Sequence, residues 1–319
     1  MSFKSQSNER CFELIMLKKF EKHIKSNLSF LKGKKLLLAV SGGVDSMILS
    51  KLLHQLKYDI YLAHCNFGLR SKESDGDENF IRKYSNKANI DLFTVRFDTK
   101  KYAKDAKLSI QLAARELRYK WFNELLAEYG FDYILTAHHL DDSLETFFIN
   151  FSRGTGLDGL TGIPEQNNKI IRPLLAFSRN EIEAYARENS IEWREDSSNA
   201  SDKYLRNKLR HDVVPVIKSL NNGFMASFLE TLEHLQQAQS MVKDASVLVY
   251  KQVVTEKEGQ KYINIDLLTR LPNYKAYLYE WLNPFGFTAW NDINGLLYAQ
   301  SGKQVLSSGY KLLKDRSVL

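Results

Sequence analysis

The chain has 319 residues, 44% hydrophobic and 26% charged, a balance typical of a globular protein with one large domain or two ordinary ones. No apolar stretch approaches the ~20 residues that cross a bilayer, and the polar N-terminus lacks a signal-peptide core, so we expect a cytoplasmic protein without membrane contact. The net charge of +7 is compatible with an RNA partner. The only cysteines, Cys11 and Cys65, argue against a disulfide framework or a cysteine metal cluster.

The first two thirds of the sequence alternates predicted helices and strands. In chain order we expect an amphipathic helix over residues 11–31, strands over 36–40, 59–64, 91–97, 133–137 and 169–175, and helices over 47–53, 77–89, 109–129, from residue 141, and over 181–189. Polar segments over 70–76, 152–162 and 195–203 are predicted loops. This alternation predicts an α/β fold with a parallel, Rossmann-like sheet covered on both faces. Ligands of such sheets bind at the carboxyl ends of the strands.

The alternation stops near residues 215–222, where we predict a domain boundary. Residues 1–215 would form the α/β domain, and residues 216–319 a second, mainly helical domain. Helical spacing of apolar residues continues over 225–242 and again over 281–297. The first of these helices could serve a core or a homodimer.

Residues 41–46 read Ser-Gly-Gly-Val-Asp-Ser between the first strand and its helix. Glycines at this turn let backbone N–H groups approach an anion, and a helix N-terminus favours phosphate. The pattern differs from a Walker loop because no Gly-Lys-Ser/Thr follows. It resembles the loop of PP-loop ATP pyrophosphatases, which cleave ATP between its α- and β-phosphates. The expected ATP-binding residues in this segment are Ser41, Gly42, Gly43, Val44, Asp45 and Ser46.

The second strand and the long helix carry further candidates. His64 and Asn66 follow the second strand and could contact the adenine or ribose of ATP. Arg115 and Arg118 share a helix face, and their guanidinium groups could meet phosphates. A solvated helix face would explain the same arginines without a function.

The fourth strand ends in a pair of histidines followed by acids. Asp141, Asp142 and Glu145 would cluster on the first turn of a helix, where they could hold Mg²⁺ or the ammonium group of an amine substrate. His138 or His139 could act as a general acid or base. Acids are also favoured at helix N-termini without any function.

Two basic segments come later. Arg153 opens a Gly-rich loop that could cover a site or approach a nucleic-acid backbone. Arg206 and Arg210 are four residues apart on an expected helix, where they could contact phosphate or simply face solvent.

Together these residues resemble the tRNA(Ile)-lysidine synthase family, a bacterial branch of the PP-loop enzymes. The likeness covers residues 33–215 in colinear order. Its motifs lie at 41–46, 64–70, 113–119, 136–146, 153–160, 172–175, 195–199, 206–207 and 210–211. Phe67 stands where the family usually has a second histidine, so no role of that histidine transfers. The family often has a further C-terminal domain that helps to hold tRNA, so we expect either a short form or a chain truncated before it.

The resemblance implies that ATP adenylates the carbonyl oxygen at carbon 2 of the wobble cytidine in an isoleucine tRNA with a CAU anticodon and releases pyrophosphate. L-lysine then attacks carbon 2 and displaces AMP. With the residue chemistry, it suggests catalytic roles for Asp45, Arg115, His138, Asp141 and Glu145. ATP would also contact His64, Asn66 and Arg118, and lysine or tRNA would contact Asp142, Arg153, Arg206 and Arg210. Mg²⁺ would bind Asp45, Asp141 and Glu145.

Two alternatives stay open. Another PP-loop enzyme that adenylates tRNA would share the loop, but thiolases of this class commonly need paired cysteines. A non-catalytic RNA-binding protein on the same fold would be expected to lack the site acids, which are present here.

Overall fold

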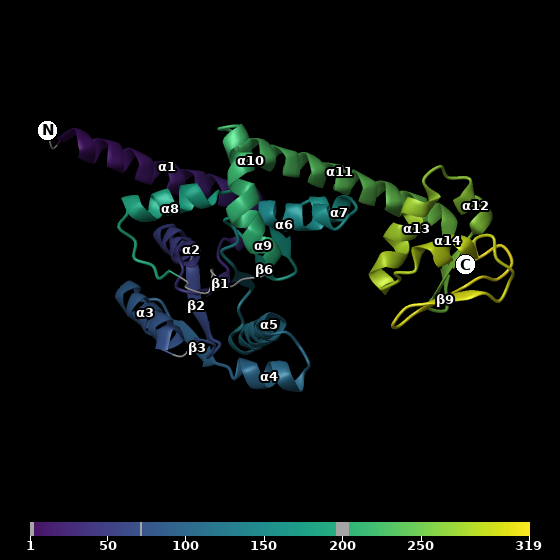
Figure 1. Ribbon diagram of the computed structural model, residues 1–319, viewed down its shortest axis with the longest axis horizontal. Coiled ribbons are helices and arrows are strands. Elements are labelled where there is room, and N and C mark those ends of the chain that lie inside the picture. Colours follow the sequence, from purple (N-terminus) through teal and green to yellow (C-terminus); the bar gives the residue numbers. More distant parts are fainter. Residues whose placement is uncertain (1–2, 71, 196–203) are drawn as a thin grey trace. The chain divides into compact units, whose positions relative to one another are not determined.

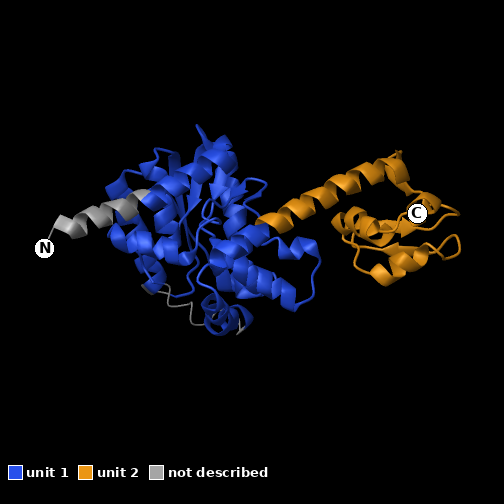
Figure 2. Cartoon of the chain, turned by 90° about the horizontal axis from the view of Figure 1, so that it is seen from above, with its two compact units in different colours: residues 1–232 blue, residues 233–319 orange. Residues whose placement is uncertain are grey.

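The computed structural model describes residues 3–70, 72–195 and 204–319, and within them the side chains of all residues except 3–14, 72 and 204. The chain divides into two compact units, Met1–Leu232 and Glu233–Leu319 (Figure 2). Residues 196–203 lie outside the described residues, and they include most of the 195–199 motif. No helix in the described ranges is both long enough and apolar enough to span a bilayer.

Unit 1 is built around a six-stranded sheet in the order β3-β2-β1-β4-β6-β5 (Figure 1). Neighbouring strands pair in parallel, except for β5 and β6, which form an antiparallel edge. The strands are β1 (Lys35–Ala39), β2 (Asp59–Asn66), β3 (Leu92–Arg96), β4 (Tyr133–Leu135), β5 (Gln166–Asn167) and β6 (Ile170–Ile171). The predicted α/β fold with a mostly parallel sheet is therefore confirmed.

The apolar run of β1 is explained by cores on both of its faces. Leu36 and Leu38 pack with α1 (Phe3–Asn27), α2 (Val44–Gln55) and α8 (Arg179–Glu188), whereas Leu37 packs with Phe122 of α5 (Ile110–Tyr129). Because side chains alternate along a strand, a strand buried on both faces reads as a continuous apolar segment.

The helices of unit 1 follow the strands as crossover connections or extend from the sheet. They are α1 (Phe3–Asn27), α2 (Val44–Gln55), α3 (Lys72–Ala88), α4 (Thr99–Asp105), α5 (Ile110–Tyr129), α6 (Leu140–Ser152), α7 (Leu157–Leu160), α8 (Arg179–Glu188), α9 (Tyr204–Lys208) and α10 (Val214–Leu220), with a 3₁₀ turn at Ser29–Leu31 and a π-helical turn at Leu209–Val213. A small third core joins α6 to α10 and to the start of α11 through Leu144, Val214 and Phe228.

Unit 2 has its own core, centred on Leu268, Leu278 and Ile293. The long helix α11 (Phe224–Val253) begins in unit 1 and ends in unit 2. Unit 2 continues with β7 (Val254–Lys257), β8 (Gln260–Ile263), α12 (Ile265–Thr269), α13 (Tyr274–Leu282), a 3₁₀ turn (Asn283–Phe285), α14 (Trp290–Leu296), β9 (Gln304–Leu306) and β10 (Lys311–Leu313). Its strands form two small antiparallel hairpins. The helical pattern of the sequence did not predict them, because each strand has only three or four residues.

The burial of α1 on the sheet yields a test of the fold. Phe20 is fully buried on this helix, whereas Ile15 is 42% exposed. We expect Phe20→Ala to lower the free energy of unfolding by about 3–5 kcal/mol, because it leaves a cavity in the larger core. Ile15→Ala on the same helix should cost less than about 1 kcal/mol. Urea unfolding of both variants measures the difference, and equal losses would contradict the packing of α1.

Candidate active site

The turn between β1 and α2 is fixed by hydrogen bonds among its own residues. Ser46 Oγ donates to the Gly43 carbonyl (3.0 Å) and accepts from the Ser41 N–H (3.2 Å), and the Gly43 N–H donates to Ser41 Oγ (3.3 Å). Gly42 has a φ of +89°, a backbone conformation that favours glycine. The serines and glycines of the motif therefore build the turn itself.

This turn leads directly into the N-terminus of α2. Gly43 precedes the first helical residue, Val44, and has no side chain with which to cap the helix. The first N–H groups of a helix lack intrahelical acceptors and attract anions. The backbone at the start of α2 is therefore chemically suited to an anion.

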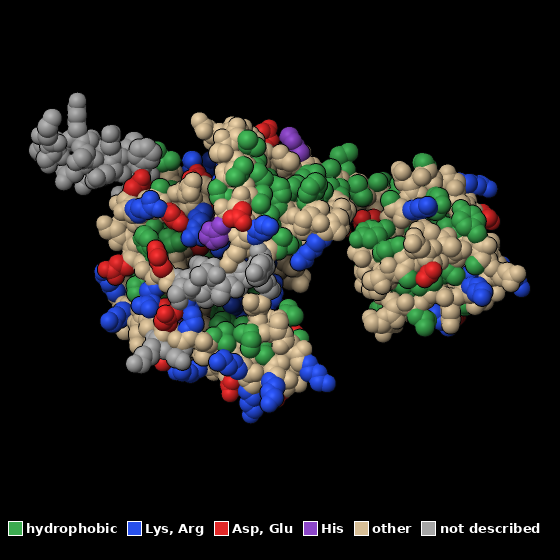
Figure 3. Space-filling model, viewed as in Figure 1, with side chains coloured by type: hydrophobic (Ala, Val, Ile, Leu, Met, Phe, Trp, Pro, Cys, Tyr) green, Lys and Arg blue, Asp and Glu red, His purple; other side chains and the backbone are tan. Residues whose placement is uncertain are grey.

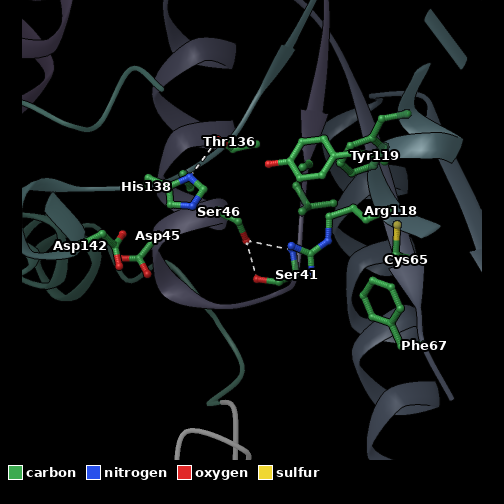
Figure 4. A pocket seen from close by; sticks show the side chains of 15 residues that line it. Ser41, Asp45, Ser46, Cys65, Phe67, Arg118, Tyr119, Thr136, His138 and Asp142 are labelled. Carbon is green, nitrogen blue, oxygen red and sulfur yellow. Dashed lines mark hydrogen bonds between the residues drawn. The ribbon is translucent and has the colours of Figure 1, made fainter. Parts of the chain in front are cut away.

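The turn forms one wall of a pocket of about 440 Å³ at the carboxyl ends of β1, β2 and β4 (Figure 4). This is where ligands of parallel sheets bind. Six predicted residues line the pocket, namely Ser41, Asp45, Ser46, Arg118, His138 and Asp142. Its other polar or aromatic lining side chains are Cys65, Phe67, Tyr119, Phe122 and Thr136.

The two arginines of α5 differ in position. The guanidinium of Arg118 lines the pocket and lies 5.2 Å from the centroid of the Phe67 ring. Arg115 is exposed, does not line the pocket, and places its guanidinium 4.8 Å from the centroid of Tyr119. Arg118 is thus the better-placed phosphate ligand in this conformation.

His138 and Thr136 lie together at the end of β4. The Nδ1 atom of His138 is 3.0 Å from Thr136 Oγ1. Burial lowers the pKa of His138 to about 4, although the nearby Asp142 carboxylate partly opposes this effect. The imidazole is therefore neutral at pH 7.

Asp45 and Asp142 meet beside a second, buried histidine. His139 Nε2 lies 3.8 Å from Asp45 Oδ1 and 3.7 Å from Asp142 Oδ2. Figure 4 shows the two carboxylates side by side at the pocket. Burial raises the pKa of Asp45, and the attraction of His139 offsets part of the rise. Asp45 Oδ1 is buried and accepts no hydrogen bond from the described residues.

The predicted magnesium triad of Asp45, Asp141 and Glu145 does not form. Within the described part of the chain, no three His, Cys, Asp or Glu residues are grouped to hold a metal ion. Both carboxylate oxygens of Asp141 accept hydrogen bonds, one from the Arg179 N–H (2.8 Å) and one from the Lys218 ammonium. Burial opposes ionisation of Asp141, but these two partners bring its pKa below the usual value. Asp141 therefore ties α6 to α8 and α10.

Glu145 is likewise held by ionic partners. Its carboxylate accepts two hydrogen bonds from the Arg210 guanidinium, at 2.6 and 3.1 Å, and lies 3.2 Å from Arg206 Nε. Glu145 is buried, whereas the Arg206 side chain is 44% exposed. The basic segment after residue 203 thus packs its arginines on α6. Arg153 caps the other end of α6, about 18 Å along the helix axis from its first turn, and does not line the pocket.

His64 and Asn66 lie at the end of β2 but do not line the pocket. His64 donates from Nδ1 to the Val40 carbonyl (2.9 Å), and burial lowers its pKa. Its Nε2 then carries a lone pair, buried and without a described partner. The amide of Asn66 donates to Asp75 and Glu78, and its oxygen accepts from the Gly68 N–H. Asn66 therefore anchors α3 in this conformation.

Some site residues had weak signals in the sequence. Thr136 immediately precedes the predicted histidines, and Tyr119 follows Arg118, so each could have been proposed from its place at a strand end or on a helix face. Lys218 had none, because it lies 77 residues from Asp141 in the chain.

The lowered pKa of His138 predicts a pH dependence of stability. The unfolded chain protonates this histidine near its ordinary pKa of 6.5, but the folded chain does so only near 4. Acid therefore favours unfolding, and the stability present above pH 6.5 is lost as the pH falls toward 4. Between pH 7 and pH 5, the free energy of unfolding should fall less in His138→Gln than in the parent protein. Urea titrations at the two pH values measure this difference. Identical pH slopes would contradict the burial of a neutral imidazole.

Two known protein families match separate parts of the chain. The PP-loop domain family matches residues 16–217, and the TilS substrate binding domain matches residues 256–319. The U34-tRNA thiolase NcsA from Methanococcus maripaludis superposes with a TM-score of 0.58 over 72% of this chain and 80% of its own. At 21% identity, this likeness concerns the fold alone.

Proteins named tRNA(Ile)-lysidine synthase are similar over most of the chain. That of Bacteroides thetaiotaomicron is 40% identical over 93% of this chain and 70% of its own length. Those of Porphyromonas gingivalis strain W83 and Parabacteroides distasonis are 37% and 38% identical over 93% and 89% of this chain. The chain spans only 65% and 64% of the length of these two relatives. The chain belongs to the tRNA(Ile)-lysidine synthase family of PP-loop enzymes.

Proposed function

We propose that the protein uses ATP to join L-lysine to carbon 2 of the wobble cytidine in an isoleucine tRNA with a CAU anticodon. In the first step the C2 oxygen attacks the α-phosphate of ATP, the α–β phosphoanhydride bond breaks, and pyrophosphate leaves. In the second step the lysine ε-amine attacks C2 and AMP leaves with that oxygen. The observation that carries the proposal is a PP-loop turn that lines one pocket together with the carboxylates of Asp45 and Asp142.

The ATP phosphates would bind at the turn of residues 41–46 and the start of α2. Ser41 and Ser46 would add hydroxyl donors to the backbone N–H groups, and Arg118 would approach from the opposite wall. A guanidinium can bind phosphate through two parallel hydrogen bonds. This arrangement stabilises the negative charge that develops on the departing pyrophosphate.

Asp45 and Asp142 suit the two cations of the reaction, Mg²⁺ and the lysine ammonium. Magnesium in nucleotide sites is usually held by one or two carboxylates together with phosphate oxygens. Asp45 fits this role because it lies in the first turn of α2 and has a buried oxygen without a described partner. Bound there, Mg²⁺ would neutralise phosphate charge. Asp142 would then be available to the ammonium group of lysine.

Lysine must lose a proton before its amine can attack. His138, with a pKa of about 4, is a weak base at neutral pH and is better suited to hydrogen bonding as a neutral ring. With Mg²⁺ at Asp45, we assign proton acceptance to Asp142, the other carboxylate that lines the pocket. Asp141 and Glu145 would act as positioning residues that hold α6, and Arg206 and Arg210 would contact tRNA from the same cluster.

A sulfur-transferring PP-loop enzyme is the less favoured alternative. The pocket contains Cys65, but burial raises the pKa of its thiol to about 12, so the reactive thiolate is scarce. The sequence has one other cysteine, Cys11, whose side chain is outside those described. A purely RNA-binding role would not explain the carboxylates of Asp45 and Asp142 in the pocket.

The different positions of the α5 arginines give a matched test. Arg118→Ala should raise the KM for ATP by about tenfold or more, because a hydrogen bond between charged groups contributes about 1.5–3 kcal/mol. Arg115→Ala should change it by less than about threefold, since it removes an exposed cation outside the pocket. Pyrophosphate release at varied ATP measures both variants. Equal effects would contradict the assignment of Arg118.

The proposed reaction is tested by incubating the protein with ATP, labelled lysine and an isoleucine tRNA transcript with a CAU anticodon. Label should enter this RNA and not a transcript whose wobble cytidine is replaced by uridine. A full-length relative serves as the positive control. If the control labels the RNA and this protein does not, the proposed function is wrong for this chain.

A further inference from the structure

Much of the positive charge of the chain is concentrated beside the pocket. Residues 99–120, which span α4 and most of α5, contain seven Lys and Arg residues and only two Asp and Glu residues. The whole chain has a net charge of +7. Figure 3 shows Lys and Arg side chains gathered over α4, at the bottom of the view.

The α4 patch consists of Lys100, Lys101, Lys104 and Lys107, all exposed. Lys100 and Lys104 are four residues apart on one side of α4 (Thr99–Asp105), and Lys107 follows the helix, just beyond its C-cap Ala106. Across the described part of the chain, no ion pair joins any of these four lysines to an acid. The patch therefore presents an excess of positive charge to solvent, because Asp105 is the one acid among residues 99–107.

Helix stability does not explain this arrangement. Lys100 and Lys101 lie in the first turn of α4, where the helix dipole disfavours cations. The helix is stabilised there instead by Asp98, whose side chain accepts a hydrogen bond from the Lys101 N–H (3.1 Å). Only Lys104, in the last turn, occupies a position that favours a cation. The helix dipole therefore gives no reason for Lys100 and Lys101 to stand in this turn.

The patch is coupled to the pocket through packing. Helix α4 packs on α5, and the Tyr102 hydroxyl donates to the Glu116 carboxylate (3.2 Å) to link the two helices. Helix α5 in turn supplies Arg118, Tyr119 and Phe122 to the pocket wall. A polyanion bound at α4 would therefore lie next to the pocket in which its base reacts.

We propose that the α4 patch binds the sugar-phosphate backbone of the RNA substrate next to the reacting nucleotide. This inference rests on the proposed function, because it assigns a second contact surface to the same substrate. The four ammonium groups are point charges, which suit phosphates and cannot distinguish bases. The patch should therefore contribute affinity and salt dependence to RNA binding, and not the choice of base.

The test is a variant with Lys100, Lys101, Lys104 and Lys107 all changed to alanine. Alanine favours a helix, so α4 should persist. The matched control removes the same charge from exposed lysines on α1 and α3, at Lys18, Lys22, Lys83 and Lys87. A third variant changes the four α4 lysines to arginine, which keeps the charge.

We expect the alanine variant to bind the CAU-anticodon tRNA at least about tenfold more weakly in moderate salt, with a log Kd against log salt slope smaller by about 0.7–0.9 for each lost phosphate contact. The KM for tRNA should rise while the KM for ATP stays unchanged. The control and the arginine variant should resemble the parent protein.

An unchanged Kd and salt slope in the alanine variant would overturn the inference, as would an equal loss in the control. So would weaker binding to anionic lipid vesicles with unchanged tRNA affinity. These results would leave the proposed function intact as long as the parent protein still forms lysidine. Absence of lysidine with the parent protein would contradict the proposed function instead.

Discussion

The burial of β1 on both faces is the constraint on which the rest of the site depends. Leu36 and Leu38 fill one core and Leu37 fills the other, and none of the three is exposed. A slip of one residue would exchange all three side chains between the cores, so the end of the strand is fixed. The turn that follows is fixed with it, and so is the start of α2. Because β2 and β4 pair with β1 in parallel, their polar ends reach the same edge.

Charge compensation determines which acids of that edge remain available. Asp45, Asp141 and Asp142 gather around His139 at the start of α6, on which Glu145 also lies, and the partners of these four acids differ. Lys218 neutralises Asp141, and Arg210 neutralises Glu145, so these two carboxylates hold helices together. Asp45 keeps a buried oxygen without a described partner. Like charges in a buried site are costly. The cations that the proposed reaction brings, Mg²⁺ and lysine, would relieve that cost at Asp45 and Asp142.

The sequence predicted what depends on local pattern. Alternating apolar segments identified the parallel sheet, and the motif of residues 41–46 identified the turn that lines the pocket, since each signal lies within a few residues. The short helix α4 was not predicted, because seven residues with three lysines show no apolar period. The expected magnesium ligands are not grouped in the described part of the chain, and spacing on one helix cannot reveal partners such as Lys218 or Arg210, which come from distant segments. Local sequence patterns thus located the pocket, whereas ion pairs between distant segments determine which carboxylates remain available there.

We propose that this pocket transfers AMP to an RNA base before lysine reacts. The most direct measurement incubates the protein with α-³²P-labelled ATP and CAU-anticodon isoleucine tRNA in the absence of lysine. We expect label on the RNA together with an equal amount of pyrophosphate, and release of that label as AMP when lysine is added. Pyrophosphate formed without labelled RNA, or label that persists after lysine is added, would contradict it.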